Sequence, residues 1–280
     1  MKTQIIVDSA SDLPQNNDAG LIVIPLRVNF GDEEYLDGVT LDHNTFYEKL
    51  IESDTLPKTS QITPSIYEEY INKALENADE VIIITLSSKL SGTYQSACIA
   101  ADSYDGKVYV VDSKNATCGE AVLTMFAVEL VNQGKTAKEV AEILTKEADK
   151  IHLVALLDTL EYLKKGGRIS GAVAMAGNLL SLKPVVCIED GEVKFLGTAR
   201  GSKRGNNYLI EEIDKIGGVN FNKPYYLAYT GLSDILLQKY ITDCGDLWKN
   251  HTDNLPIMRV GSTIGTHIGP GAIAVAFFEN

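Results

Sequence analysis

The segment from Val81 to Ala101 constrains the fold most, because it predicts a buried strand, a hydroxyl-rich loop and a helix in succession. Its sequence is VIIITLSSKLSGTYQSACIAA, and the helix is expected to begin near Gly92. Such a junction directs free backbone N–H groups and the positive end of the helix dipole toward one point. Further donors surround that point at Ser87, Ser88, Ser91 and Thr93. The segment therefore predicts an anion-binding place, and no nucleophile with a neighbouring base lies within it.

The first half of the chain alternates short β-branched runs with helical patterns. The expected strands are Gln4–Val7, Leu21–Val28, Val81–Leu86 and Val108–Val111, and the expected helices lie near Asn44–Glu52, Ser65–Asn77, Thr93–Asp102 and Glu120–Gln133. Strands separated by helix-length segments predict an α/β fold with an open, mostly parallel sheet and helices on both faces. Because parallel strands end at one edge of a sheet, the loops at Asp8-Ser9, 87–92 and Asp112-Ser113 are expected to converge.

The second half predicts a different sheet. Thr136 to Asp149 has the pattern of an amphipathic helix, so we place a domain boundary near residue 150, giving domains 1–150 and 151–280. Asp190-Gly191 predicts a hairpin turn, which makes this sheet mixed or antiparallel. The other expected elements are strands at His152–Leu157, Val185–Glu189, Glu192–Leu196, Tyr225–Tyr229, Met258–Ser262 and Ile273–Phe278, and a helix at Ser233–Lys249.

Charge and cysteine usage exclude several classes of protein. The chain of 280 residues has 25 Lys and Arg against 38 Asp and Glu, a net charge of −13, which argues against nucleic acid and anionic membranes as partners. No apolar run approaches the ~20 residues of a membrane span or a signal segment, so we expect a soluble cytoplasmic protein without stable membrane insertion. The four cysteines form no CxxC pair and the histidines are scattered, so no metal and no cofactor is expected.

Two hydroxyl-bearing segments carry candidate binding residues. In Lys58-Thr59-Ser60-Gln61, the hydroxyls of Thr59 and Ser60 have no structural task, because Thr63 before Pro64 suffices as a helix cap. Ordinary capping also accounts for hydroxyls in this position. The next helix has the same surplus, because it does not need all the polar groups at its start to cap it. The candidates there are Ser91, Gly92 and Thr93.

Arg168 and His267 are further candidates. Arg168 precedes a strongly apolar segment, so its guanidinium needs an anionic or carbonyl partner, and a structural ion pair explains it as well as a ligand contact. His267 lies in the segment from Gly261 to Gly271, which is expected to be a glycine-rich loop. This histidine either donates to an anion or is purely structural.

The segment 171–182, GAVAMAGNLLSL, is apolar on nearly all sides, which predicts a buried helix. Its small residues let another helix, a sheet or a long, thin apolar ligand approach the backbone. For a ligand, the expected lining residues are Ala172, Ala174, Met175, Ala176 and Leu179.

A basic cluster of Arg200, Lys203 and Arg204 follows the predicted hairpin, in an expected loop. It is either a solvated turn or a docking site for an acidic partner. Standard enzyme motifs (GxGxxG after a strand, GxxxxGK[ST], GxSxG) are absent from the sequence, and Asp8, Asp12, Asp112 and Glu161 are interpreted as solvated or capping carboxylates.

Six segments in this order resemble the DegV family over the whole length of the chain. They are VDSASDLP at 7–14, KTSQITP at 58–64, SSKLSGTYQSA at 87–97, VVDSKNATCGEA at 110–121, LEYLKKGGRIS at 160–170 and GTHIGPGAIAVAF at 265–277. The resemblance implies a fatty-acid-binding subunit of a bacterial fatty acid kinase, which holds one long-chain fatty acid between its domains and presents it to a separate catalytic subunit.

The same resemblance implies the roles of particular residues. Thr59 and Ser91 would bind the carboxylate, Ser60, Gly92 and Thr93 would shape the cradle, and Arg168 and His267 would support it. Two other functions remain open: an enzyme that acts on a small carboxylated or phosphorylated metabolite at the same cleft, and a lipid-responsive regulator that needs no kinase. An apolar tunnel would distinguish the carrier from the enzyme.

Overall fold

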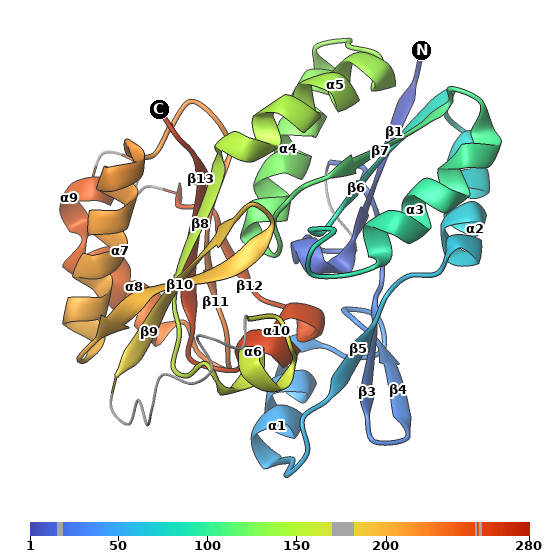
Figure 1. The fold of residues 1–280 in the computed structure, drawn as a ribbon. Helices are drawn as coiled ribbons and strands as arrows, with labels where there is room; N and C mark the ends of the chain where they lie inside the picture. Colours follow the sequence, from blue (N-terminus) through green and yellow to red (C-terminus); the bar gives the residue numbers. More distant parts are fainter. Residues whose placement is uncertain (16–18, 170–181, 250, 252–253) are drawn as a thin grey trace.

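The computed structural model describes residues 1–15, 19–169, 182–249, 251 and 254–280 (Figure 1). In this part of the chain the strands form three sheets, in the orders β2-β1-β6-β7, β10-β9-β8-β13-β11-β12 and β4-β3-β5. The α/β fold class, with a parallel sheet from the first half of the chain and a mixed sheet from the second half, is confirmed.

The first sheet is parallel throughout. Its strands are β1 (Thr3–Asp8), β2 (Ile22–Ile24), β6 (Glu80–Thr85) and β7 (Val108–Asp112), and its helices are α2 (Pro64–Leu75), α3 (Thr93–Ala101), α4 (Cys118–Asn132) and α5 (Ala137–Glu147). Helices α2 and α3 lie on one side of the sheet, and α4 and α5 lie on the other (Figure 1). Every residue of β6 is buried, as expected for a central strand covered on both faces.

The second sheet contains β8 (Ile151–Leu156), β9 (Lys183–Glu189), β10 (Glu192–Ala199), β11 (Tyr225–Tyr229), β12 (Ile257–Arg259) and β13 (Ile273–Phe278). All its described pairs are antiparallel except β11 with β12. The predicted hairpin joins β9 to β10, with positive φ at Asp190 and Gly191. Helices α7 (Ser202–Ile216) and α8 (Ile235–Asp243) pack on this sheet, and α9 (Gly245–Trp248) packs against α8.

One hydrophobic cluster joins the two large sheets. It includes residues of β1 and β6 as well as of β8 and β13, and α4 packs against both sheets. The division of the chain into two domains near residue 150 therefore stays a prediction, although the strands of the two large sheets separate at that point in the sequence.

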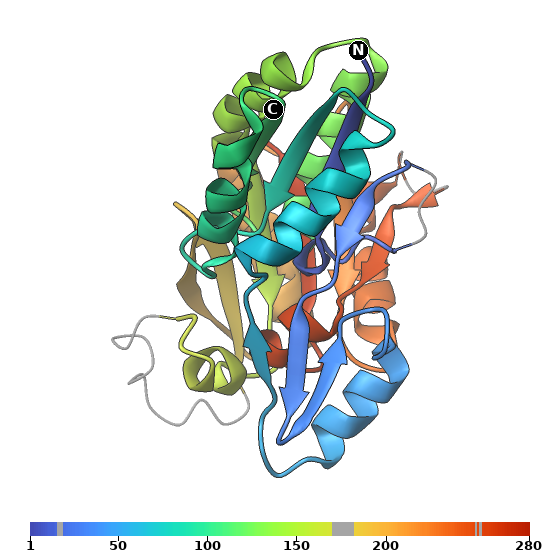
Figure 2. The same ribbon diagram turned by 90° about the vertical axis from the view of Figure 1, so that its right-hand side faces the viewer.

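The predicted strand Leu21–Val28 is wrong as a single element. Pro25, which has no N–H group to donate to a ladder, separates β2 from β3 (Arg27–Phe30). Strand β3 then pairs with β4 (Glu33–Leu36) and β5 (Lys58–Ser60), and α1 (His43–Glu52) lies beside them. Figure 2 shows this small sheet and α1 at the end of the molecule away from the N-terminus.

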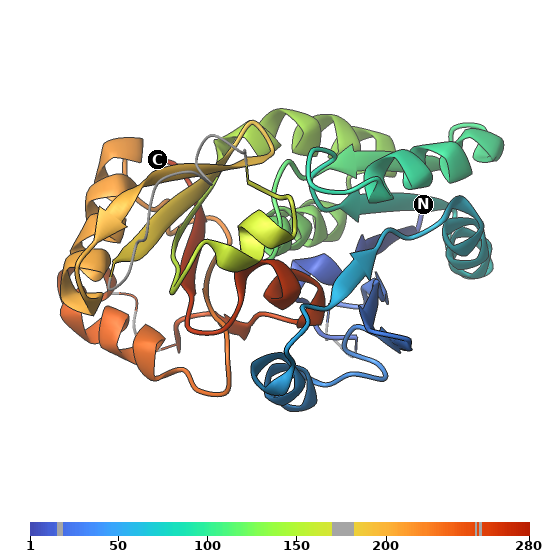
Figure 3. The ribbon, with the colours of Figure 1, turned by 60° about the horizontal axis from the view of Figure 1, so that its bottom comes forward.

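Three further expectations needed correction. The helix predicted at Ser233–Lys249 breaks at Cys244 into α8 and α9. The strand predicted at Met258–Ser262 ends at Arg259. The expected glycine-rich loop contains a helix, α10 (Ser262–Ile268), which packs against α6 (Glu161–Lys165), α1 and the small sheet (Figure 3).

Among the described helices, none combines the length and the apolar character needed to cross a membrane.

Candidate functional site

A cavity of about 240 Å³ lies where both halves of the chain meet. Its wall is apolar over much of its extent, with Leu26 and Leu86 from the first half and Leu153, Val186 and Ile264 from the second. The sequence candidates on its wall are Thr59, Ser60, Ser91, Gly92, Arg168 and His267. The structure thus brings together six of the seven residues singled out for the head of a ligand, and the seventh, Thr93, hydrogen-bonds to Ser91.

A row of alanines forms part of the cavity wall. Ala228, Ala274 and Ala155 lie directly opposite one another on β11, β13 and β8, and all three border the cavity. Because a methyl group is the smallest side chain with a Cβ, this row leaves space above the sheet. Sequence reasoning missed it, although the alternation of small and large residues in IAVAFF at 273–278 is a signal that could have found it.

Thr59 and His267 meet at the wall of the cavity. Thr59 Oγ1 lies 2.9 Å from His267 Nε2, joining β5 to the C-terminal end of α10. A methyl group on Gly166 would collide with His267 Nδ1, so this glycine lets α6 approach the imidazole closely. Burial, followed by the nearby charge of Arg168, lowers the pKa of His267 to about 4. The imidazole is therefore neutral at neutral pH.

Ser91 is held by the first residue of α3. Thr93 N donates to Ser91 Oγ over 3.2 Å, and the two hydroxyl oxygens lie 2.9 Å apart. Ile62 N donates to Thr93 Oγ1 over 3.4 Å, which connects this pair to the segment that carries Thr59. A Cβ at Gly92 would meet the amide group of the Gln61 side chain, which would have to move.

Arg168 binds backbone carbonyls. Its Nε donates to Leu90 O over 3.2 Å and its Nη1 donates to Gly166 O over 2.6 Å. Of the anionic or carbonyl partners expected for the guanidinium, the structure has carbonyls. No carboxylate pairs with Arg168 within the described ranges. The guanidinium therefore ties the loop before α3 to the end of α6.

Thr63 precedes α2 as predicted, but its side chain does not cap the helix. Its hydroxyl lies 3.0 Å from the Ser65 hydroxyl instead. Pro64 at the first helical position leaves one fewer backbone N–H to satisfy there.

Two carboxylates hold the other end of α10, and sequence reasoning missed their role. Asp37, which is 3% exposed, accepts from Ser262 N (2.9 Å), Ser262 Oγ (2.6 Å) and Thr263 N (3.2 Å). Asp12 Oδ1 accepts from Gly261 N over 2.8 Å. These bonds satisfy N–H groups at the start of the helix, which explains why a glycine-rich segment is helical here.

Of the two expectations for Asp8, a solvated or a capping carboxylate, the capping one is confirmed, because its side chain caps the short helical turn Ser9–Ser11. Asp8 is fully buried, accepts from Ala10 N and Leu86 N, and burial raises its pKa to about 7. Burial also raises the pKa of Asp12 and of Glu120 well above the ordinary values. Glu161 is exposed and pairs with Lys165. In the described part of the chain, no group of three or more His, Cys, Asp or Glu is arranged to hold a metal ion.

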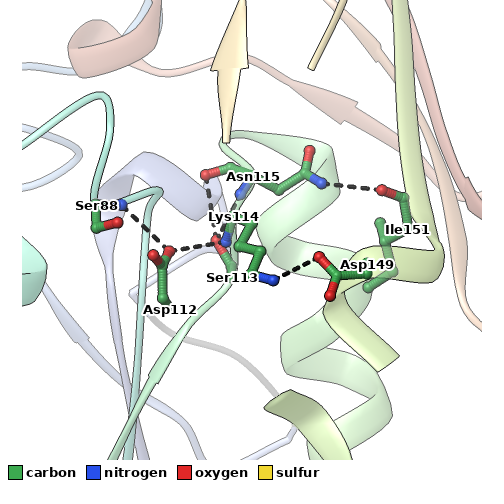
Figure 4. A network of polar contacts seen from close by, with 7 residues as sticks. All are labelled: Ser88, Asp112, Ser113, Lys114, Asn115, Asp149 and Ile151. Atoms are coloured by element: carbon green, nitrogen blue, oxygen red, sulfur yellow. Dashed lines mark hydrogen bonds and ion pairs between the residues drawn. The ribbon is translucent and has the colours of Figure 1, made fainter. Parts of the chain in front are cut away.

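The loops that follow the parallel strands converge as predicted (Figure 4). Asp112 Oδ1 accepts from Ser88 N (3.2 Å) and Lys114 N (2.8 Å), and Asn115 Nδ2 donates to Ile151 O over 3.2 Å. Asp8 joins the same edge through its bond from Leu86 N. Of these three loops, the one at 87–92 contributes Leu90, Ser91 and Gly92 to the cavity.

Two groups of candidate residues are not found at the cavity. The expected tunnel-lining residues Ala172, Ala174, Met175, Ala176 and Leu179 lie outside the described residues. Arg200, Lys203 and Arg204 are exposed and do not border the cavity. The expected loop is wrong for two of them, because Lys203 and Arg204 belong to the first turn of α7.

The fold and the cavity define an α/β protein with a parallel sheet, a mixed sheet and a largely apolar cavity whose wall includes the hydroxyls of Thr59, Ser60 and Ser91. The chain belongs to the DegV family, described as "Uncharacterised protein, DegV family COG1307", whose model matches residues 2–280. A DegV domain-containing protein of Caldanaerobacter subterraneus is 32% identical over 99% of both chains, and one of Deinococcus radiodurans is 33% identical over 99% of this chain and 98% of that protein.

Solved structures share this fold. A Thermus thermophilus DegV family protein, described by its fatty acid binding, has a TM-score of 0.86 at 31% identity and covers 99% of this chain and 100% of its own. A Thermotoga maritima protein, described as revealing fatty acid binding function, has a TM-score of 0.84 at 28% identity over 99% of both chains. The Streptococcus pneumoniae Fatty Acid Kinase B3 protein, loaded with linoleic acid, has a TM-score of 0.86 at 23% identity over all of both chains, a likeness of fold.

Proposed function

We propose that this protein binds one long-chain fatty acid, with the carboxylate at Thr59 and Ser91 and the hydrocarbon along the apolar wall of the cavity. The observation that carries the proposal is the cavity itself, because its wall is mostly apolar and also includes the hydroxyls of Thr59, Ser60 and Ser91. The fatty acid binding described for the Thermus and Thermotoga relatives supports it. A small polar metabolite would leave the alanine row and the leucines without a partner.

The tail and the carboxylate of a bound fatty acid are expected to contribute different amounts of binding free energy. Burying fourteen methylene groups at ~0.8 kcal/mol each contributes on the order of 11 kcal/mol before the costs of ordering. Each hydrogen bond to a charged group contributes roughly 1.5–3 kcal/mol. The tail therefore supplies most of the affinity, and the hydroxyls fix the position of the carboxylate.

The remaining candidates take supporting roles in this proposal. Ser60, Gly92 and Thr93 shape the cradle around the carboxylate, and Arg168 and His267 hold the groups that touch it. Residues Ala172, Ala174, Met175, Ala176 and Leu179 complete the channel for the tail.

We also propose that the protein is a carrier rather than a catalyst, and that a separate fatty acid kinase phosphorylates the bound carboxylate. The family resemblance and the shared fold with the Streptococcus pneumoniae kinase component support this proposal. The exposed cluster of Arg200, Lys203 and Arg204 is the proposed docking site for that kinase, since it is basic on a chain of net charge −13.

The experiment that tests the carrier function is mass spectrometry of the protein purified from cells, first under native and then under denaturing conditions. We expect one long-chain fatty acid for each chain. Ala274→Phe fills the alanine row, so this variant should retain much less lipid at an unchanged melting temperature. A homogeneous, ligand-free parent protein that also fails to take up added palmitate would contradict the proposal and favour the enzyme alternative.

The kinase proposal is tested by charge reversal. Arg204→Glu should weaken binding to the partner kinase about tenfold while lipid content stays the same. Lys138→Glu on α5 is the matched control, because this exposed lysine carries the same charge far from the cluster in sequence. Equal kinase affinity for the parent and Arg204→Glu proteins would dispose of the docking site.

A further inference from the structure

Three fully buried polar side chains beside the parallel sheet have no hydrogen bond in the part of the chain that the structure describes. They are Glu120 on α4, Tyr67 on α2 and Thr85 at the end of β6, and neither carboxyl oxygen of Glu120 has a partner. None of the three borders the cavity. A buried polar group without a partner costs free energy, so three of them in one region need an explanation.

The three side chains meet near the carboxyl edge of the sheet. Helices α2 and α4 both pack against β6, and Thr85 and Asp8 are the last residues of the paired strands β6 and β1. Burial raises the pKa of the Tyr67 hydroxyl, and the nearby charges of Asp8 and Glu120 raise it further. Burial and then the charge of Asp8 also raise the pKa of Glu120. Asp8 is therefore a neighbour of all three.

The surroundings of Glu120 do not favour a negative charge. Within the described ranges Glu120 has no ion pair, and the charged groups that act on it are all acidic: Asp8 of β1, Asp12 after it and Asp112 of β7. Burial also raises the pKa of the Tyr67 hydroxyl and of the Cys98 thiol on α3, so both are neutral. An ionised carboxylate without a cation or a hydrogen bond is far more costly to bury than a neutral carboxyl group. The geometry therefore favours a protonated Glu120.

We propose that Glu120, Tyr67 and Thr85 form a binding site for internal water at the start of α4, with the Glu120 carboxyl group in its neutral form. A buried water molecule commonly makes about three hydrogen bonds to polar groups that otherwise lack a partner. Such a molecule both donates and accepts, so it can serve two hydroxyls and a carboxyl group together. The site joins α4 to α2 and to the end of β6.

The same residues favour water over a metal ion. In the described part of the chain, no group of three or more His, Cys, Asp or Glu is arranged around a metal. The hydroxyl protons of Tyr67 and Thr85 also need acceptors, and a cation offers none.

Infrared spectroscopy of the whole protein tests the protonation. The carbonyl stretch of a protonated carboxyl group is separate from the bands of a carboxylate. We expect this band in the parent protein at pH 7, and its loss of intensity in Glu120→Gln. Glu142→Gln is the matched control, because Glu142 is exposed on α5. An unchanged band in Glu120→Gln would overturn the inference.

The pH dependence of stability is a second test of the neutral form. A carboxyl group whose pKa rises on folding contributes most below its ordinary pKa of 4.5, and this contribution is lost as pH rises. The unfolding equilibrium constant of the parent protein relative to Glu120→Gln should therefore increase about tenfold for each pH unit between pH 5 and pH 7. A constant ratio, as expected for Glu142→Gln, would contradict the inference.

Oxygen-17 magnetic relaxation dispersion tests the water itself, because it detects internal water molecules with long residence times. Glu120→Met keeps much of the side-chain volume but removes both oxygens, so it should show less long-lived water than the parent and Glu120→Gln proteins. Equal amounts in all three would refute the site. If the protonated band were missing and sodium chloride stabilised the parent protein where choline chloride did not, a cation would bind there, and the proposal of water would be wrong.

Discussion

The two ends of α10 differ in their surroundings: carboxylates bind the N-terminal end, whereas the C-terminal end borders the cavity. At the N-terminal end, Asp37 and Asp12 accept hydrogen bonds from the backbone and hold the helix in place. At the C-terminal end, His267 makes one bond, to Thr59, beside an open cavity. The carboxylates at the first end already have their donors and stabilise the fold. The hydroxyls that border the cavity at the second end can still bind a ligand. We therefore expect substitutions at the first end to reduce mainly stability and substitutions of the cavity hydroxyl at the second end to reduce mainly binding.

The largest expected effect follows from removing Asp37. Asp37→Ala leaves Ser262 N, Thr263 N and two buried hydroxyls without an acceptor, so the free energy of unfolding should fall by about 4 kcal/mol. Urea denaturation followed by circular dichroism measures it.

Asp42→Ala is the matched control for that substitution, because Asp42 caps α1 in an exposed position and should contribute only about 1 kcal/mol. If Asp37→Ala cost no more than Asp42→Ala, the N-terminal end of α10 would not be an anchor, and the contrast between its two ends would fail.

The pH dependence of stability should differ in sign between the two ends. The pKa of His267 falls from 6.5 to about 4 on folding, so its contribution is present above pH 6.5 and is lost as pH falls toward 4. That change amounts to about 3 kcal/mol. Asp8, beside the anchoring carboxylates, has a pKa raised from 3.8 to about 7, so its contribution is greatest below pH 3.8 and is lost as pH rises through 7.

Unfolding free energies measured between pH 4 and 7 check this prediction. The stability of the parent protein relative to His267→Gln should rise with pH, and its stability relative to Asp8→Asn should fall with pH. If both stability differences, parent against His267→Gln and parent against Asp8→Asn, rose or both fell with pH, the predicted opposite signs would be wrong.

The smallest expected effect is mainly on binding. Thr59→Val should weaken palmitate binding about tenfold through the loss of one hydrogen bond to a carboxylate, and it should lower the melting temperature only slightly, because it also removes the partner of His267 Nε2. Ser88→Ala is the control, since Ser88 is exposed in the loop before α3 and does not border the cavity. A loss of stability in Thr59→Val larger than its loss of affinity would place Thr59 among the structural residues.

The sequence predicted what depends on local patterns. The parallel sheet follows from β-branched runs spaced by helices, and the β9–β10 hairpin follows from Asp190-Gly191. Thr59 and Ser91 stand out as hydroxyls before a helix, although Thr63 does not cap α2 as that argument assumed. Those two residues come from different segments, and the structure places both on one cavity wall.

The features that sequence reasoning missed depend on partners distant in the chain. Helix α10 forms because Asp37, 225 residues before Ser262, satisfies its first N–H groups. The small sheet depends on pairing between β3 and β5, and the alanine row becomes visible only when β8, β11 and β13 align in register. Periodicity reports which residues are buried, but not which buried residues share one wall.

The most direct measurement is carbon-13 NMR of carboxyl-labelled palmitate bound to the protein, followed from pH 4 to pH 8. If the carboxylate lies at Thr59 and Ser91, hydrogen bonds to its ionised form should lower its pKa, so that its signal stays constant over this range and titrates again in the Thr59→Val, Ser91→Ala double variant. A bound signal that titrates in the parent protein as the free acid does would show that the carboxylate lies elsewhere, and would contradict the account.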